Sequence, residues 1–290
     1  MKLKKFISNV VAFFLAPIFF PAICFADLSP EQIKIVDTIA QQNLSYFSEL
    51  PNNISLKYTF VLNDPTFILK HDTKISSDRI CDYSQSESRN KGLRIFAFDG
   101  TNYQEQNDDY LLISKSRTRF ETTFNSIWAS CPITLMFNFT SPSQRISGGC
   151  SALAQWNSWS NLAERIVSIN TTKIEGRDFV QMEVKVDKGI MRMTFDPNMN
   201  YYPIKLENIN SSGQKQGESV VKKFKKVSFN GKNIIVPSLI IGRTPKSEYN
   251  MCILDDESLS FDEITNVDFF KIPLSGAVHV TDLDIKVDLK

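Results

Sequence analysis

The stretch FVQMEVKVDKGIMRMTFD, residues 179–196, decides the fold. Apolar and polar residues alternate before the turn sequence DKG and alternate again after it. Successive side chains of a β-strand point to opposite faces, so this pattern predicts an antiparallel hairpin with one buried face. The apolar positions of that face are Val180, Met182, Val184, Val186, Met191, Met193 and Phe195.

Alternation of this kind continues in both directions from the hairpin. Short turns, such as DG at 99–100 and NGK at 230–232, separate the alternating segments. Strands are predicted at 55–62, 67–70, 74–83, 93–98, 101–106 and 110–116, and again at 202–208, 218–229, 233–241 and 261–270. The sequence therefore predicts a long antiparallel meander.

Two regions show helical patterns instead. Ser29 and Pro30, followed by Gln32, are typical of a capped helix start, and apolar residues at helical spacing extend that helix to about residue 50. A helical insert is predicted at about 120–170. It contains two short pieces within 124–139 and a helix at 150–169, where Trp156 and Trp159 share an apolar face.

A sheet of at least ten strands tends to curl or close, and its apolar face needs a cover. The two helical regions are the covers that the sequence offers. We therefore expect an α+β fold, in which a strongly curved antiparallel sheet, a half-barrel, is covered by helices. Residues 27–290 are expected to form this single domain with its helical insert.

The first 26 residues have the pattern of a secretory signal. Three lysines precede an apolar run that ends in Cys24-Phe25-Ala26, just before Asp27. An uncleaved membrane anchor and a lipidated Cys24 are the alternatives, but Pro17 and Pro21 interrupt the run and Ile23 is large for lipoprotein cleavage. The mature chain is therefore expected in the periplasm or outside the cell.

The charge of the mature chain excludes a general affinity for nucleic acid. Removal of the signal changes the 33 basic and 32 acidic residues of the full chain to 30 and 32, because it takes away three lysines and no acid. Such a balance gives no broad attraction to nucleic acid or to anionic membranes. The mature protein is expected to be monomeric.

Four cysteines remain after export, an even number that favours disulfides. A Cys131–Cys150 bond would close a loop of about 20 residues and contribute roughly 3 kcal/mol. A Cys81–Cys252 bond then follows by elimination. Buried free thiols are the alternative. The cysteine spacings and the two histidines, His71 and His279, predict no zinc site.

Several segments resemble a known family. They are IFAFDGTNYQ (95–104), MTFDPNMNYYPIKLE (193–207), KKVSFNGKNIIVPSLI (225–240) and FFKIPLSGAVHVTD (269–282). They are similar to segments of outer-membrane lipoprotein-sorting proteins, the LolA/LolB-like family. The resemblance implies a curved half-barrel closed by helices around an apolar cavity, and it implies lipids or lipoprotein acyl chains as ligands. The family's cargo-handling arginine and polar residues have no counterpart here.

The leading hypothesis is a non-enzymatic exported protein that binds a lipid, a lipoprotein acyl chain or another apolar group inside the curved sheet. No cofactor is predicted. Methionines give such a wall an adaptable shape, although ordinary core packing explains the same residues. The candidate cavity residues are Tyr58, Phe60, Trp156, Trp159, Met182, Val184, Met191, Met193 and Phe195.

Two further hypotheses remain. One is an interaction module with a filled core that docks an envelope protein, and the other is a hydrolase with an unrecognised site. The sequence contains no G-x-S-x-G, P-loop or H-E-x-x-H motif. The lysines at 222, 223, 225 and 226 suggest a phosphate-bearing partner or protection of a sheet edge. Five N-x-[ST] triplets, beginning at Asn43, Asn53, Asn138, Asn170 and Asn210, are interpreted as exposed loop or strand-end positions.

Overall fold

The computed structural model describes residues 28–61, 68–76, 79–87, 92–107, 110–115, 120, 127, 130–137, 165–186, 189–262, 264, 267–273, 276–280 and 285–289. The signal segment and most of the insert, with Trp156, Trp159 and Cys150, lie outside these residues. Among the described residues, no helix has the length and apolar character needed to cross a membrane.

One 15-stranded sheet organises the described chain. The first strands are β1 (Asn53–Val61), β2 (Ile68–Ser76), β3 (Arg79–Ser86), β4 (Arg94–Phe98), β5 (Tyr103–Gln106) and β6 (Tyr110–Ser114). The next are β7 (Ile166–Ile174), β8 (Arg177–Val186), β9 (Gly189–Asp196), β10 (Tyr202–Asn210), β11 (Lys215–Phe229), β12 (Lys232–Arg243) and β13 (Glu248–Leu254). The last are β14 (Gly276–Val280) and β15 (Ile285–Leu289).

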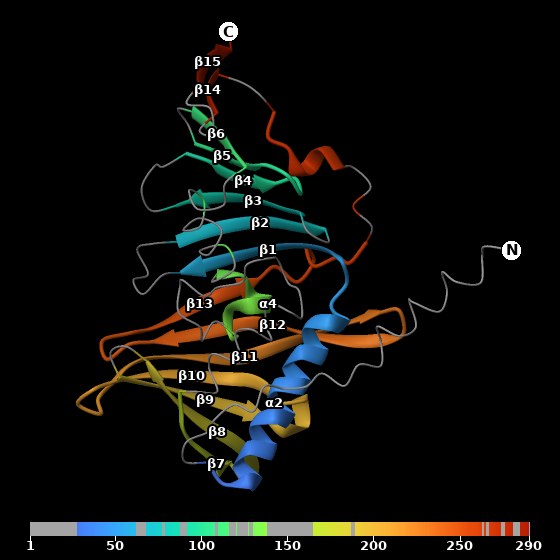
Figure 1. Cartoon of the computed structure of the whole chain (residues 1–290). Helices are drawn as coiled ribbons and strands as arrows, with labels where there is room; N and C mark the ends of the chain where they lie inside the picture. The colour runs from blue at the N-terminus through green and yellow to red at the C-terminus, as the bar shows by residue number, and fades with distance from the viewer. Residues whose placement is uncertain are drawn as a thin grey trace, which may run out of the picture.

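Two meanders meet in the middle of this sheet. The strand order is β15-β14-β6-β5-β4-β3-β2-β1-β13-β12-β11-β10-β9-β8-β7, so the chain's first strand pairs with its thirteenth. The sheet twists strongly from one end to the other and is open, with β15 and β7 at its edges (Figure 1). The predicted α+β fold with a curved sheet is confirmed. One pairing differs, because β14 lies parallel to β6.

Helix α2 (Pro30–Glu49) lies across the C-terminal half of the sheet (Figure 1). Its start is the predicted capping box, in which Ser29 Oγ accepts from the Gln32 backbone N–H and Gln32 Oε1 accepts from the Ser29 N–H. Gln32 also donates from its side chain to the carbonyl of Ile169 on β7, at 2.9 Å. The short helix α4 (Pro132–Leu135) packs against β12 and β13.

The sheet has an inner and an outer face. The inner face is the side whose residues share the main core cluster with α2 and α4, including Ile39, Phe47 and Ile133. The outer face is the opposite side. A second, smaller cluster forms there, where residues 264–273 return across β3–β6 and place Phe270 and Ile272 against Cys81, Ala97 and Leu111.

Three element predictions were wrong. Residues 166–169, predicted as the end of a helix, begin strand β7, where β-branched residues and alternation take over. Residues 261–270, predicted as a strand, contain instead the 3₁₀ helix η4 (Val267–Phe270), because this segment is used to cover the outer face. The gap predicted between strands 67–70 and 74–83 was also wrong, because β2 is continuous from Ile68 to Ser76 and β3 begins at Arg79. Strands β13, β14 and β15 were not predicted as separate strands.

Candidate ligand-binding site

The predicted cavity residues that the structure describes gather on the inner face. All seven belong to the main core cluster, and Met182, Val184, Met193 and Phe195 have no exposed surface. The other three are Tyr58, Phe60 and Met191, each at most 8% exposed. Their role as the lining of a ligand cavity stays a prediction. The structure packs them as a filled wall, which we call the inner wall.

A cavity of about 250 Å³ opens beside this wall, between α2 and the sheet. We call it the α2 cavity. It is lined by Gln42, Asn43, Ser45, Tyr46, Glu49, Phe137, Met199, Asn200, Tyr202, Asn233, Ile234 and Ile235. None of the seven described residues that were proposed from the sequence lines it. Its lining comes from four separate segments, so no local pattern could have indicated it.

Aromatic rings form the body of the α2 cavity. Tyr46 stacks on Phe137, with ring centres 5.4 Å apart, and both rings meet Tyr202 edge-on. Phe224 of β11 contacts the other side of Tyr202, at 5.4 Å. The hydroxyl of Tyr46 donates to the carbonyl of Ile235 at 3.0 Å, which ties α2 to β12. Rings packed edge-to-face hold a fixed shape, so this part of the cavity is preformed.

Burial keeps the phenol of Tyr202 neutral. Removal from water raises its pKa well above the usual value, and the neighbouring Tyr46 raises it further. The cavity therefore combines three uncharged aromatic rings with the polar side chains of Gln42, Asn43, Ser45, Asn200 and Asn233, and with Glu49 at its rim. Glu49 is paired with Lys232, whose Nζ lies 3.2 Å from Oε1.

Asn43 supplies an unused polar atom at the cavity. Its side chain is 2% exposed, and its amide nitrogen donates to the carbonyls of Ile39 and Tyr201 at 2.7 and 3.3 Å. Its Oδ1 has no hydrogen-bond partner among the described residues. A buried acceptor without a partner is costly and usually has a role. The prediction that Asn43 is an exposed loop or strand-end residue was wrong, because it faces the core from within α2.

The chain bends sharply at one wall of the α2 cavity. Asn200 and Tyr201 both have left-handed backbones, with φ of 52° and 54°. This conformation is uncommon outside glycine and is unfavourable for a bulky aromatic residue. The bend directs the start of β10 so that Tyr202 is buried beneath α2.

A buried polar cluster occupies the inner face of β2 and β3. Thr73 donates to Asp82 Oδ1 at 2.5 Å, and the His71 Nδ1 lies 3.0 Å from Asp82 Oδ2. Tyr58 stacks on the His71 ring at 4.6 Å and hydrogen-bonds Ser130. His71 Nε2 has no partner among the described residues. The sequence did not indicate this cluster, although period-two spacing puts His71 and Thr73 on one face.

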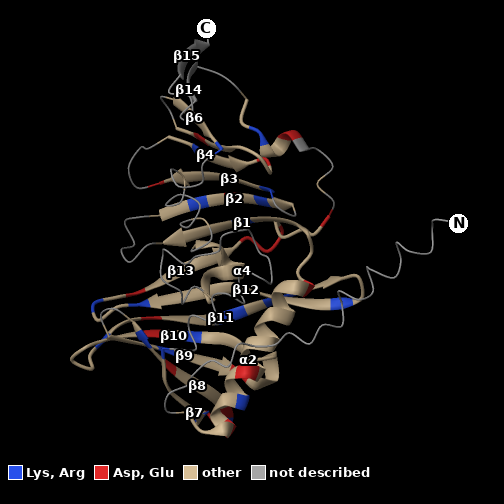
Figure 2. Ribbon diagram, in the orientation of Figure 1, with Lys and Arg blue, Asp and Glu red and all other residues tan. Residues whose placement is uncertain are grey.

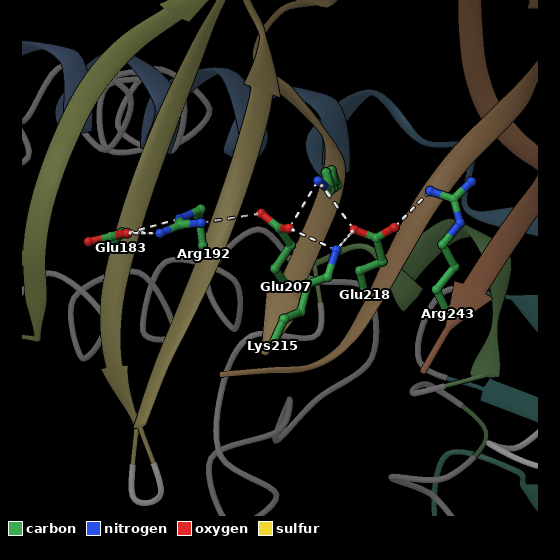
Figure 3. Close-up of polar contacts among 7 residues, drawn as sticks. Glu183, Arg192, Glu207, Lys215, Glu218 and Arg243 are labelled. Carbon is green, nitrogen blue, oxygen red and sulfur yellow. Dashed lines mark hydrogen bonds and ion pairs between the residues drawn. The ribbon is translucent and has the colours of Figure 1, made fainter. Parts of the chain in front are cut away.

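The outer face of the C-terminal half carries a continuous row of ion pairs, which we call the charge ladder (Figure 3). Directly opposed residues on six neighbouring strands form its axis: Glu183, Arg192, Glu207, Glu218, Arg243 and Glu248. Glu207 faces Glu218, and Lys205 Nζ separates the two carboxylates at 3.0 and 3.2 Å. Lys215 Nζ lies 3.6 and 2.9 Å from them.

Glu218 is the most strongly held carboxylate of this ladder. Burial acts to raise its pKa, but hydrogen bonds from Arg243, Lys215 and Lys205 outweigh that effect and lower the pKa to about 2. Its side chain is only 3% exposed. The ladder therefore joins strands β8–β13 on the side away from the inner wall.

The structure does not contain the predicted disulfides. Cys81, Cys131 and Cys252 are buried free thiols. Cys81 and Cys252 lie on β3 and β13, three strand spacings or roughly 14 Å apart, and on opposite faces, which is too far for a disulfide. Burial raises the pKa of Cys81 and of Cys131 to about 12. Among the described residues, no group of three or more His, Cys, Asp and Glu could hold a metal ion.

With this geometry, the protein falls in the class of open, curved antiparallel sheets partly covered by helices, which is the architecture that the sequence resemblance implies. No protein-family model and no curated protein matches the chain. Solved structures do resemble it in fold, at low sequence identity.

One is a putative outer membrane lipoprotein-sorting protein domain from Vibrio parahaemolyticus, 10% identical, with a TM-score of 0.44, covering 81% of this chain and 96% of that one. A DUF1329 family protein from Desulfovibrio piger is 8% identical, with a TM-score of 0.45 and coverage of 83% and 97%. A LolA superfamily protein from Nitrosomonas europaea is 14% identical, with a TM-score of 0.39 and coverage of 81% and 97%. These similarities concern the arrangement of the chain alone.

Proposed function

We propose that this protein is an exported, non-enzymatic carrier that binds the apolar chain of a lipid or lipoprotein in the α2 cavity and along the inner wall. The observation that carries the proposal is the α2 cavity itself. It is a partly enclosed space walled on one side by the rings of Tyr46, Phe137 and Tyr202, and Tyr202 belongs to the same core cluster as the inner wall.

The mechanism of binding would be burial. Each methylene group removed from water contributes about 0.8 kcal/mol, so an acyl chain can be held without a charged contact. The α2 cavity lies just below the usual volume of ligand pockets, about 300–1,000 Å³. A longer chain would require side chains of the inner wall to rearrange. Met182, Met191 and Met193 suit that demand because their thioether side chains adapt to varied shapes.

Matched tryptophan variants on α2 test the cavity. Ser45 lines the α2 cavity, whereas Ser48, one turn further, is exposed and outside its lining. We expect Ser45→Trp to weaken binding of a fluorescent palmitoyl probe to delipidated protein about tenfold or more, while Ser48→Trp leaves it unchanged. Urea unfolding midpoints should stay similar for both variants, because both positions are on the surface.

A tryptophan in the inner wall tests the deeper part of the proposal. If the chain reaches Met193, Met193→Trp should reduce probe affinity more than stability. If this residue is ordinary core, the same change is overpacking and costs roughly 1–3 kcal/mol of unfolding free energy, with no loss of binding. Wild-type protein that binds no palmitoyl probe after delipidation would contradict the carrier function.

One observation favours a second candidate. Met182, Val184, Met193 and Phe195 are fully buried by other side chains, as in a filled core. A protein with such a core could act instead as a module that docks an envelope protein. Absence of probe binding by the wild-type protein would favour this function. Both candidates require export, and N-terminal sequencing of protein from its own host should then begin at Asp27.

A further inference from the structure

Two buried polar atoms beside the α2 cavity lack hydrogen-bond partners among the described residues. One is Oδ1 of Asn43, and the other is the hydroxyl oxygen of Tyr202. Both residues line the α2 cavity, and their exposed fractions are 2% and 4%. Buried polar atoms are nearly always hydrogen-bonded. Two unpaired atoms at one cavity therefore indicate a partner that enters from outside the described chain.

The hydrogen bonds of Asn43 determine which of its amide atoms is unused. Its nitrogen donates to the carbonyl of Ile39, one turn earlier on α2, at 2.7 Å and to the carbonyl of Tyr201 at 3.3 Å. An amide nitrogen has two hydrogens, so both are used. Rotating the amide by half a turn would place its oxygen against two carbonyl oxygens, which repel it. Oδ1 is therefore an acceptor that needs a donor.

The hydroxyl of Tyr202 complements Asn43 because it can donate. Burial raises the pKa of Tyr202 well above its usual value, so the hydroxyl keeps its proton. Both residues belong to one contact between α2 and the start of β10. Asn43 binds the carbonyl of Tyr201, and Tyr46, one turn further along α2, packs edge-on against the ring of Tyr202. The cavity thus offers an acceptor and a donor at the same contact.

The cavity favours an uncharged ligand group at this contact. Among its described lining residues, Glu49 is the only charged one, and Lys232 already pairs with that carboxylate. Residues 38–48 of α2 carry no charge, and that half of the helix is tan in Figure 2. A buried charge without a partner is costly. A hydroxyl or an amide can both donate and accept without bringing a charge into the cavity.

We propose that the α2 cavity selects apolar ligands carrying an uncharged hydroxyl or amide group, which donates to Asn43 Oδ1 and accepts from the Tyr202 hydroxyl. This inference rests on the proposed carrier function and names its ligand class and two residues that select it. The stacked rings of Tyr46 and Phe137 supply apolar surface for the chain. A ligand without a donor leaves Oδ1 unpaired, whereas chain burial is the same for ligands of equal chain length.

Dodecyl ligands that differ only in their polar group test the donor. In displacement of the fluorescent palmitoyl probe from delipidated wild-type protein, we expect dodecanol to bind about five- to tenfold more tightly than dodecyl methyl ether, whose oxygen accepts but cannot donate. Lauramide and its N,N-dimethyl derivative make the same comparison for an amide. A preference within only one of the two pairs identifies the hydroxyl or the amide as the group that is recognised.

Tyr202→Phe tests the second hydrogen bond, because it removes the hydroxyl and keeps the ring. Dodecanol and dodecyl methyl ether should both bind about fivefold more weakly, whereas dodecane, which has no polar group, should bind unchanged. The urea unfolding midpoint should not fall, since an unpaired buried hydroxyl does not stabilise the fold. Tyr83→Phe, in the outer cluster of β3, is the matched control and should leave the binding of all three ligands unchanged.

Asn43→Leu tests the acceptor. Dodecanol should lose its preference over dodecyl methyl ether, because the variant has no oxygen to receive the hydroxyl proton. A preference that persists in this variant would show that the methyl cap is excluded by shape, and would overturn the inference. If the variant does not fold, because the amide nitrogen also holds Ile39 and Tyr201, the ligand pairs and Tyr202→Phe decide the question.

The outcomes separate this inference from the carrier function. Equal affinity within both ligand pairs for the wild-type protein would overturn the inference, assign the two atoms to bound water and leave the carrier function standing. Unchanged dodecanol affinity in Tyr202→Phe would also overturn it. Failure of every dodecyl ligand and of the palmitoyl probe to bind would overturn the carrier function itself.

Discussion

The two halves of the sheet distribute apolar and polar side chains differently. In the C-terminal half, β7–β13, the inner face is the apolar wall and the outer face carries the charge ladder. In the N-terminal half, β1–β6, the inner face includes the buried pair of His71 and Asp82, and the outer face buries an apolar cluster under residues 264–273. Successive side chains alternate between the two faces in both halves, but the segments that pack on those faces differ.

This difference shows that the elements packed on a sheet decide which of its faces carries apolar side chains and which carries polar ones. The C-terminal half has α2 on one side and solvent on the other, so polar side chains can stay hydrated outside. The N-terminal half is also covered on its outer face, so its outer positions accept Cys81, Ala97 and Leu111. Its inner polar groups must then satisfy one another, because they cannot reach water.

The largest expected effect comes from breaking the buried polar cluster. Asp82→Ala leaves the Nδ1 of His71 and the hydroxyl of Thr73 without their shared partner inside the protein. We expect a loss of about 3–5 kcal/mol in unfolding free energy, measured by urea denaturation. Asp72→Ala, on the neighbouring strand β2, is the control, because its carboxylate is on the outer face and pairs with the exposed Lys57.

The control should cost no more than about 1 kcal/mol. Similar losses for Asp82→Ala and Asp72→Ala would show that inner and outer polar groups of this half contribute equally to stability. That result would contradict the view that only the inner groups depend on one another for hydrogen bonds.

The next effect comes from removing the outer cover of the N-terminal half. Phe270 is 1% exposed and packs against Cys81, whereas its neighbour Phe269 is 40% exposed. Phe270→Ala should lower the unfolding free energy by about 3 kcal/mol, and Phe269→Ala by much less. In native Phe270→Ala, Cys81 should be alkylated faster than in the wild type, while Cys252 on the inner face should remain protected.

Peptide mapping after a short iodoacetamide pulse measures both thiols in one sample. Equal acceleration of Cys81 and Cys252 would mean that the variant unfolds globally rather than opening its outer cover.

The smallest effect concerns the charge ladder. The pKa of Glu218 is lowered to about 2 in the folded protein from an ordinary value of 4.5. A lowered pKa stabilises the folded state above pH 4.5, and this contribution is lost as the pH falls from 4.5 toward 2. After allowance for solvent screening, we expect about 1–2 kcal/mol at pH 7.

Urea unfolding of Glu218→Gln and wild-type protein should therefore differ most at pH 7, differ less at pH 3, and converge only near pH 2. Glu257→Gln, at an exposed position, is the control and should match the wild type at each pH. A difference for Glu218→Gln that does not depend on pH would argue against a role for its charge.

Elements with a strong local pattern were predicted well. Ser29, Pro30 and Gln32 specify the start of α2 through bonds within one turn, and the 179–196 hairpin follows from its alternation and short turn. Elements that depend on distant partners were not. The parallel pairing of β14 with β6 and the use of 264–273 as a cover involve residues more than 150 positions apart.

The sequence by itself determined the strand-rich meander, the capped helix α2 and which residues of β8 and β9 share the inner wall. These features depend on neighbours at spacings of two to four residues. Only the tertiary structure decided that His71 meets Asp82 inside, that Cys81 and Cys252 lie on opposite faces, and that four distant segments enclose the α2 cavity. Alternation fixes which residues share a face, but the free energy of long-range packing decides which face is covered, and by what.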